Sequence, residues 1–193
     1  MQEFTVTSGA LPGSEKIYVK GELFNVRVPM RKIKLSDTLD ADGKRIANEA
    51  VVVYDTSGPY TDPDYAVDLR KGLPRIREEW IVARKDTEKL EELSSEYGRM
   101  RQSDSSLDAL RFEHVNTHPR IARSGHGITQ MYYARQGIIT PEMEYIAIRE
   151  NQYIDRITEN YKKEAGNPLG AYIPSPITPE FVRQEVAAGR AII

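Results

Sequence analysis

The chain has 193 residues, which is enough for one domain or for one domain with appendages. Its 27 basic and 29 acidic residues nearly cancel, so the chain lacks the strong positive field of a dedicated nucleic-acid-binding protein. No apolar run is long enough to span a membrane and the first residues do not resemble a secretory signal, so we expect a cytoplasmic protein.

Cysteine is absent from the sequence. This absence excludes disulfides, cysteine nucleophiles and zinc ribbons, and an iron–sulfur cluster held by this chain alone would have no thiolate ligands. Composition therefore indicates a globular protein and no particular function, which must be argued from individual segments.

The N-terminal third of the chain carries the signals of a small β-sheet. Residues 1–14 are rich in Gly, Pro and Ser and predict a flexible tail. Short runs of apolar residues follow and predict three strands, near 16–20, 26–35 and 51–54. Because the connections are short, we predict an antiparallel or mixed sheet within a subdomain over 15–62.

Single residues predict two details of this sheet. Between Met30 and Ile33 the apolar positions change phase, which predicts a β-bulge. Pro29 fits either that bulge or an edge strand, because proline cannot donate a hydrogen bond to a ladder. All four residues of 51–54 are apolar, which is typical of a strand covered on both faces.

Helical signals dominate residues 63–177. Pro74 suits a first helical position and is followed by apolar residues at helical spacing. Gly98 is expected to end a second helix, after an apolar stripe that includes Leu93. The polar residues of 98–110 then predict a flexible excursion between helices.

The clearest helix boundaries lie nearer the C-terminus. Thr140 is followed by Pro141 and an acidic first turn, which is the pattern of a capped helix start, and the pattern recurs at Thr178. Gly137 and Gly189 stand where C-terminal caps belong.

Residues 178–193 are predicted to form a helix and the start of a strand, because Ala191, Ile192 and Ile193 are apolar. An unpaired apolar strand is an aggregation hazard, so we expect a buried strand to continue from there. Together these patterns predict an α+β fold with a small N-terminal β-sheet followed by packed helices.

The three histidines raise the question of a metal site. His114 and His118 are four residues apart, a spacing that on a helix places both imidazoles on one face. Pro119 biases His118 away from helical dihedrals, and no Glu follows His114 as in the metalloprotease motif. We favour two loop histidines bonded to backbone, and a metal-dependent hydrolase that uses them with His126 is an alternative.

Residues 123–127, with the sequence RSGHG, are a candidate anion site. Two glycines let backbone amides approach a ligand, and the segment leads into a predicted helix N-terminus, where unpaired N–H groups attract phosphate. Arg123 would add a fork of donors and His126 a proton-sensitive donor. The alternative is a turn that needs glycine dihedrals, with His126 as a cap.

Other charged clusters have ordinary structural explanations. Glu142, Glu144 and Glu150 share one predicted helix, and we interpret them as complementing the helix dipole and pairing on the surface rather than as acid–base catalysts. A basic stretch is interpreted as a solvated sheet face rather than an RNA-binding surface; it contains Arg27, Arg31, Lys32 and Lys34.

Three blocks stand out in order along the chain: 16–19 with 26–33 (KIYV and VRVPMRKI), 53–63 (VYDTSGPYTDP) and 130–151 (QMYYARQGIITPEMEYIAIREN). Together they resemble the N-terminal region of the ThiC (phosphomethylpyrimidine synthase) family, over about 16–193. Two positions depart from the family pattern: Tyr132 stands where His is common, and Gln136 where a basic residue is common. A role of that histidine in the family would not carry over to Tyr132.

The resemblance implies a radical S-adenosylmethionine lyase of thiamine biosynthesis, which converts aminoimidazole ribonucleotide into hydroxymethylpyrimidine phosphate. It implies homodimers in which an N-terminal domain precedes a central (β/α)8 barrel and a C-terminal cysteine motif that holds a [4Fe-4S] cluster. The ligands of the nucleotide, of zinc and of the cluster would then lie beyond Ile193.

On this basis the chain is expected to be a fragment truncated before the barrel, with no catalytic residue and no metal or cofactor site of its own. We expect it to orient the barrel and to help form the dimer, with Arg123 and His126 as candidates for contact with a substrate phosphate. The competing interpretation is a stand-alone binding or dimerisation module with no catalytic role.

Overall fold

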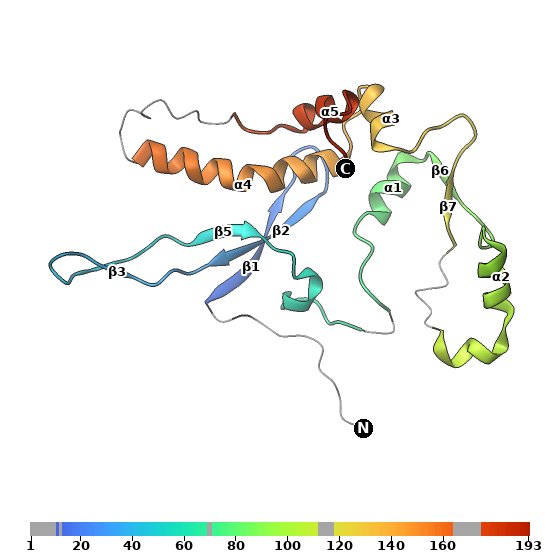
Figure 1. Cartoon of the computed structure of the whole chain (residues 1–193), viewed down its shortest axis with the longest axis horizontal. Coiled ribbons are helices and arrows are strands. Elements are labelled where there is room, and N and C mark those ends of the chain that lie inside the picture. Colours follow the sequence, from blue (N-terminus) through green and yellow to red (C-terminus); the bar gives the residue numbers. More distant parts are fainter. Residues whose placement is uncertain (1–10, 12, 69–70, 112–117, 164–174) are drawn as a thin grey trace.

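The computed structural model describes the chain over residues 11, 13–68, 71–111, 118–163 and 175–193. Small antiparallel sheets and several helices alternate along it, which confirms the predicted α+β class (Figure 1). The strands of the principal sheet are β1 (Ser14–Lys20), β2 (Arg27–Ile33) and β5 (Val51–Tyr54).

The principal sheet has the order β1-β2-β5 and is antiparallel throughout. Val28 and Met30 of β2 are fully buried on the face that packs against helix α4 (Pro141–Lys163). Tyr54 of β5 lies on the same face, and its hydroxyl is 3.0 Å from the hydroxyl of Tyr145 in α4. The long helix therefore closes the apolar side of the sheet.

The predicted bulge is wrong, because β1 and β2 pair without interruption from Ser14↔Ile33 to Lys20↔Arg27. The predicted edge position of Pro29 is also wrong, since β2 is the central strand. Pro29 is tolerated because the ladder with β5 runs only from Met30, and beyond it the Pro29 carbonyl still accepts from Asp55 N at 3.1 Å. The missing donor thus falls at the end of a ladder.

β5 is an edge strand rather than a strand covered on both faces, and Val53 is 39% exposed. The change of apolar phase in β2 has a different cause from a bulge. Arg31 is buried on the face opposite Met30, so both faces of this strand are covered, one by apolar and one by charged partners. Arg31 therefore does not belong to the solvated basic face that we expected.

Between β2 and β5 the chain forms a β-hairpin with strands β3 (Thr38–Leu39) and β4 (Arg45–Ile46), and Figure 1 shows it projecting away from the sheet. Almost every residue of this hairpin is exposed, including Leu39 at 64% and Ile46 at 50%. A two-stranded hairpin of this kind gains little stability by itself.

The C-terminal helices form the second packed unit. α5 (Pro179–Ala187) packs against both α3 (Gln130–Arg135) and α4. The buried core of this unit consists of Ala134, Met143, Ala147, Val182 and Val186.

The boundaries of these helices confirm the predicted caps. α4 begins at Pro141 after Thr140, and α5 begins at Pro179 after Thr178, whose hydroxyl accepts from Phe181 N at 3.1 Å. Gly137 and Gly189 follow α3 and α5 with φ of 75° each, the left-handed conformation that glycine adopts without strain.

The middle of the chain differs from the helical region that we expected. α1 (Glu78–Arg84) begins four residues after Pro74, and Gly98 lies inside α2 (Glu96–Ser103) rather than at a helix end. Residues 98–110 are largely helical, because they contain most of α2 and the 3-10 helix η2 (Ser105–Leu110). A second 3-10 helix, η1 (Gly58–Thr61), follows β5.

Two short strands also lie within 63–177: β6 (Thr87–Lys89) pairs antiparallel with β7 (Arg120–Ala122). At the C-terminal end, residues 191–193 follow α5 without strand pairing, and Ile192 is 97% exposed.

Candidate functional site

The carboxylate of Glu144, in the first turn of α4, holds the loop between β1 and β2. Its oxygens accept backbone hydrogen bonds from Glu22 and Leu23, both at 2.7 Å, and from Phe24 at 2.9 Å. The residue is 2% exposed. Glu144 is therefore not the surface residue that we expected, and it instead fastens the helix to the strand loop with three charge-assisted bonds.

Gly21 makes this close approach possible. A Cβ atom at Gly21 would lie 2.5 Å from Oε2 of Glu144 and 2.4 Å from Cγ2 of Val26. Both distances are shorter than real carbon contacts allow, so the loop and the carboxylate come together only because this residue has no side chain.

Glu142 is the second buried carboxylate of α4, with 4% of its surface exposed. Arg77 donates to Oε1 at 2.8 Å and Arg84 donates to Oε2 at 3.0 Å. Burial alone would raise the pKa of Glu142, but the hydrogen bonds from Arg77 and the charges of both arginines outweigh it and lower the pKa. The prediction of surface pairing holds only for Glu150, which is exposed and paired with Arg149.

A third charged cluster lies under η1, on the face of the sheet away from α4. The side chains of Lys16 and Asp55 are 2% and 4% exposed and lie 3.4 Å apart, and Arg31 donates to Asp55 at 2.8 Å. Burial raises the pKa of Asp55, but hydrogen bonds from Ser57 and the two cations lower it overall. Arg31 also donates to the hydroxyl of Thr61, which ties η1 to the sheet.

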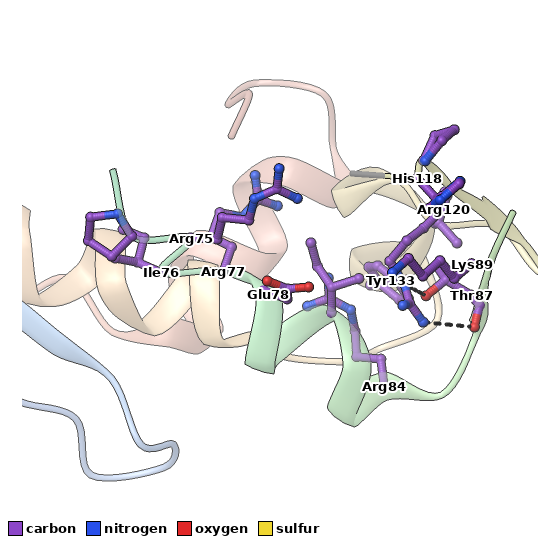
Figure 2. Close-up of a pocket in the computed structure, with 14 residues that line it drawn as sticks. Arg75, Ile76, Arg77, Glu78, Arg84, Thr87, Lys89, His118, Arg120 and Tyr133 are labelled. Carbon is purple, nitrogen blue, oxygen red and sulfur yellow. Dashed lines mark hydrogen bonds between the residues drawn. The ribbon is translucent and has the colours of Figure 1, made fainter. Parts of the chain in front are cut away.

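A cavity lies between α1, β6 and the residues that lead into β7, and has a volume of about 760 Å³ (Figure 2). Cationic side chains dominate its lining, with Arg75, Arg77, Arg84, Lys89 and Arg120 against the single carboxylate of Glu78. Arg120 is held in place by Thr87, whose hydroxyl accepts from its Nε at 2.9 Å. His118 and Tyr133 complete the polar part of the wall.

Buried polar atoms without partners cluster around this cavity. They are Arg84 Nε, His118 Nδ1 and Asp86 Oδ1, and no other described residue has such a side-chain atom. Arg84 and His118 line the cavity. Asp86 lies behind Tyr133 and accepts a hydrogen bond from its hydroxyl. Burial, with that hydrogen bond and the charge of Asp86, raises the pKa of Tyr133 to about 12.

The candidate residues from the sequence lie beside this cavity and do not line it. Arg123 and His126 are exposed in a turn in which Arg123 N donates to Asp86 O at 2.8 Å and His126 N donates to Arg123 O at 3.0 Å. The helix that follows, α3, has only six residues, and its N-cap is Thr129 rather than His126. Substrate contact by Arg123 and His126 stays a prediction.

The other residues singled out in the sequence are placed as follows. His118 precedes β7, whereas His114 lies outside the described residues. Tyr132 packs against Gly127, where a Cβ would lie 2.6 Å from its ring, and Gln136 is the C-cap residue of α3. Over the described ranges, no three side chains of His, Asp or Glu come together as metal ligands would.

Four of the cations that line the cavity lie within 75–89, and only Arg120 is distant in the chain. Sequence reasoning missed the cavity because it did not bring the strand of Arg120 next to that segment. Each arginine is unremarkable within its own segment. The usable signal was the close spacing of Arg75, Arg77, Arg84 and Lys89 in the sequence. Within the part of the chain that the structure describes, no helix is long and apolar enough to cross a membrane.

Part of the chain matches a known family. Residues 10–88 match the family model of the ThiC-associated domain. This range contains the principal sheet, the β3–β4 hairpin, η1 and α1, and it ends within β6. The match places the chain in the context of thiamine biosynthesis.

Proposed function

Residues 10–88 form a ThiC-associated domain and identify a ThiC N-terminal region, and from this premise we propose that the chain is the N-terminal part of a phosphomethylpyrimidine synthase. The whole enzyme would convert aminoimidazole ribonucleotide into hydroxymethylpyrimidine phosphate by radical S-adenosylmethionine chemistry. The family match is the observation that carries this proposal.

In this proposal the chain has a structural role and is inactive alone. The donors of these 193 residues do not fit a [4Fe-4S] cluster, because cluster irons are held by thiolates and the chain has no cysteine. The described residues also offer no group of three metal-ligating side chains for zinc. In this proposal the thiolate ligands of the cluster come from outside this sequence.

The buried carboxylates support a role as a rigid support. Glu144 fixes α4 to the β1–β2 loop, Glu142 fixes the same helix to α1, and Asp55 fixes η1 to the sheet. The β1–β2 loop, α1 and α4 are thereby held in one arrangement, and η1 is held to the sheet. A rigid arrangement of this kind is suited to orient a neighbouring domain, and we propose that the chain has this role.

The β3–β4 hairpin supports the proposed dimerising role. It projects from the sheet and exposes Leu39 and Ile46, although apolar side chains gain free energy when covered. We assign the partner of this hairpin to a second copy of the chain, because homodimers are the commonest assemblies of soluble proteins.

Two experiments test these proposals. The purified 193-residue chain, supplied with aminoimidazole ribonucleotide, S-adenosylmethionine and a reductant, should form no product, and turnover by this chain alone would contradict the structural role. Sequencing the gene past the codon for Ile193 should reveal a continuing reading frame with cysteines for the cluster. A stop codon at that point would instead support the stand-alone module.

The dimerising role is tested by light scattering on the unmodified chain and on the double variant Leu39→Lys with Ile46→Lys. The unmodified chain should have the mass of a dimer, and the variant that of a monomer. The matched control is Lys44→Gln at the tip of the same hairpin, which should stay dimeric because it removes no apolar contact. A monomeric unmodified chain would contradict the proposal.

A further inference from the structure

The cavity between α1, β6 and β7 plays no part in the proposed structural role. We propose that it is a binding site for a small organic anion, a phosphate or carboxylate attached to an apolar body. The charge of its lining and its apolar wall both point to this chemistry.

The charge of the wall selects an anion. Five cationic side chains and one carboxylate line the cavity. Glu142 contacts Arg77 and Arg84 from the α4 side, and Asp86 lies behind Tyr133, so part of this charge is compensated. The balance of these named groups nevertheless stays positive, with five cations against Glu78, Glu142 and Asp86, in a chain whose net charge is -2.

Among the cations of the wall, Lys89 is available to bind a ligand. Arg77 and Arg84 are committed to Glu142, and Arg120 is committed to Thr87. The side chain of Lys89, at the end of β6, is exposed and has no hydrogen bond or ion pair with any described residue. Arginine and lysine donors arranged in this way are suited to a phosphate or carboxylate, which offers several acceptor oxygens.

Two buried nitrogens belong to residues of the cavity wall. Arg84 Nε and His118 Nδ1 both belong to lining residues and both lack a partner among the described residues. A buried polar group without a partner is unfavourable, and such groups are few in folded proteins. Both atoms are covered by protein, so they show that hydrogen bonding behind the wall is incomplete, and the ligand donors of the proposal are the side chains that face the cavity.

The remaining wall is apolar and indicates a ligand with a carbon body. Ile76, Ile81, Pro119 and Ile128 line it together with the ring of Tyr133. The volume of about 760 Å³ lies within the range of small-molecule sites and exceeds what a single inorganic anion would fill. A compact ligand with one anionic end satisfies both parts of the wall.

Calorimetric titration of the 193-residue chain with phenyl phosphate, inorganic phosphate and phenol tests the proposal. Phenyl phosphate should bind about tenfold more tightly than phosphate, because burying an aromatic body adds to the anion contacts. Phenol alone should bind more weakly than phenyl phosphate, and added salt should weaken the binding of phenyl phosphate.

Variants locate the site. Lys89→Gln should weaken phenyl phosphate binding about tenfold, because it removes a charged donor from the wall. Lys44→Gln, in the β3–β4 hairpin, changes the net charge equally and should leave the affinity unchanged. The backbone amide signals of Lys89 and His118 should shift on titration, while that of Lys44 should not. Because Lys89 is exposed and unpaired, its variant is expected to fold.

Four results would overturn the proposal. They are the absence of binding at about 10 mM phenyl phosphate, equal affinity for phenyl phosphate and phosphate, equal loss of affinity in the two lysine variants, and tighter binding of a polyglutamate peptide than of phenyl phosphate. The last result would assign the cavity to an acidic protein segment instead of a small molecule.

Discussion

Replacing Glu144 by Gln tests whether the buried carboxylate holds the β1–β2 loop to α4. In the native protein its two oxygens accept from three backbone N–H groups, at 2.7, 2.7 and 2.9 Å. Gln keeps the shape but replaces one oxygen by an amide NH2, which donates. At least one backbone N–H would then face another donor.

The loss can be estimated from these contacts. A hydrogen bond to a charged group contributes roughly 1.5–3 kcal/mol, and a buried donor left unpaired adds its own desolvation. The first turn of α4 also loses a negative charge that complements the helix dipole, which contributes about 0.5 kcal/mol. We therefore expect Glu144→Gln to lower the free energy of unfolding by about 3 kcal/mol.

The assay is thermal unfolding followed by circular dichroism at neutral pH. For a chain of this length, a loss of about 3 kcal/mol corresponds to a fall in Tm of about 9 °C. Glu150→Gln is the matched control, because Glu150 lies on the same helix but is exposed and paired only with Arg149. It should change Tm by less than about 2 °C.

Gly21→Ala provides an independent check of the same contact. Its Cβ would lie 2.5 Å from Oε2 of Glu144, so the loop must move away from the carboxylate. The double variant with Glu144→Gln should lose less stability than the two single losses added together, because both changes break one interaction. Equal Tm values for Glu144→Gln and Glu150→Gln would refute the reasoning.

Three further outcomes are expected. Asp55→Ala should cost about 3 kcal/mol in urea unfolding because it leaves the buried Arg31 without its carboxylate, and a change in midpoint no larger than that of a surface variant would contradict this. The lowered pKa values of Asp55 and Glu142 mean that stability is present above the ordinary carboxyl pKa and is lost as pH falls through the folded values, which an acid titration of Tm measures. Tyr18 and Tyr133 have pKa values raised to about 12, so their contribution is complete below about 10 and is lost as pH rises through about 12; phenolate absorbance should show these two titrating after exposed tyrosines.

The helix boundaries near the C-terminus could be predicted because their causes are local. Thr178 caps a helix by bonding to an N–H three residues away, and Gly137 supplies a left-handed residue directly after another helix. Such features depend on neighbours within one turn, and the sequence displays those neighbours in order. The family resemblance likewise depends on contiguous blocks of residues.

The roles of the buried charges could not be predicted for the opposite reason. Glu144 finds its partners 120 to 122 residues earlier in the chain, and Glu142 finds Arg77 65 residues earlier. Within α4 alone both look like acidic residues of a first turn, which is how we interpreted them. Only the fold shows that they are covered.

Arg31 explains why the pattern of β2 was misinterpreted. Apolar periodicity assigns one face of a strand to the core, and a charged residue on the other face is taken as solvent-exposed. In this sheet the second face is covered by η1, and Asp55 supplies the compensating charge. A polar residue inside a strand therefore predicts exposure only where no compensating partner is brought over it by the tertiary structure.

The same limit applies to the cavity, and it explains why a charge balance near zero did not exclude an anion site. Net charge describes the field far from a protein, whereas a small ligand responds to the side chains within a few ångströms. The fold places Arg120 and Lys89 on paired strands and Arg84 on the helix beside them, so their charges add at one place. Glu78 and Glu142 compensate only part of this charge. Lys89→Gln with its control Lys44→Gln is thus also a test of local against overall charge: equal effects on phenyl phosphate binding would show that only the overall charge matters.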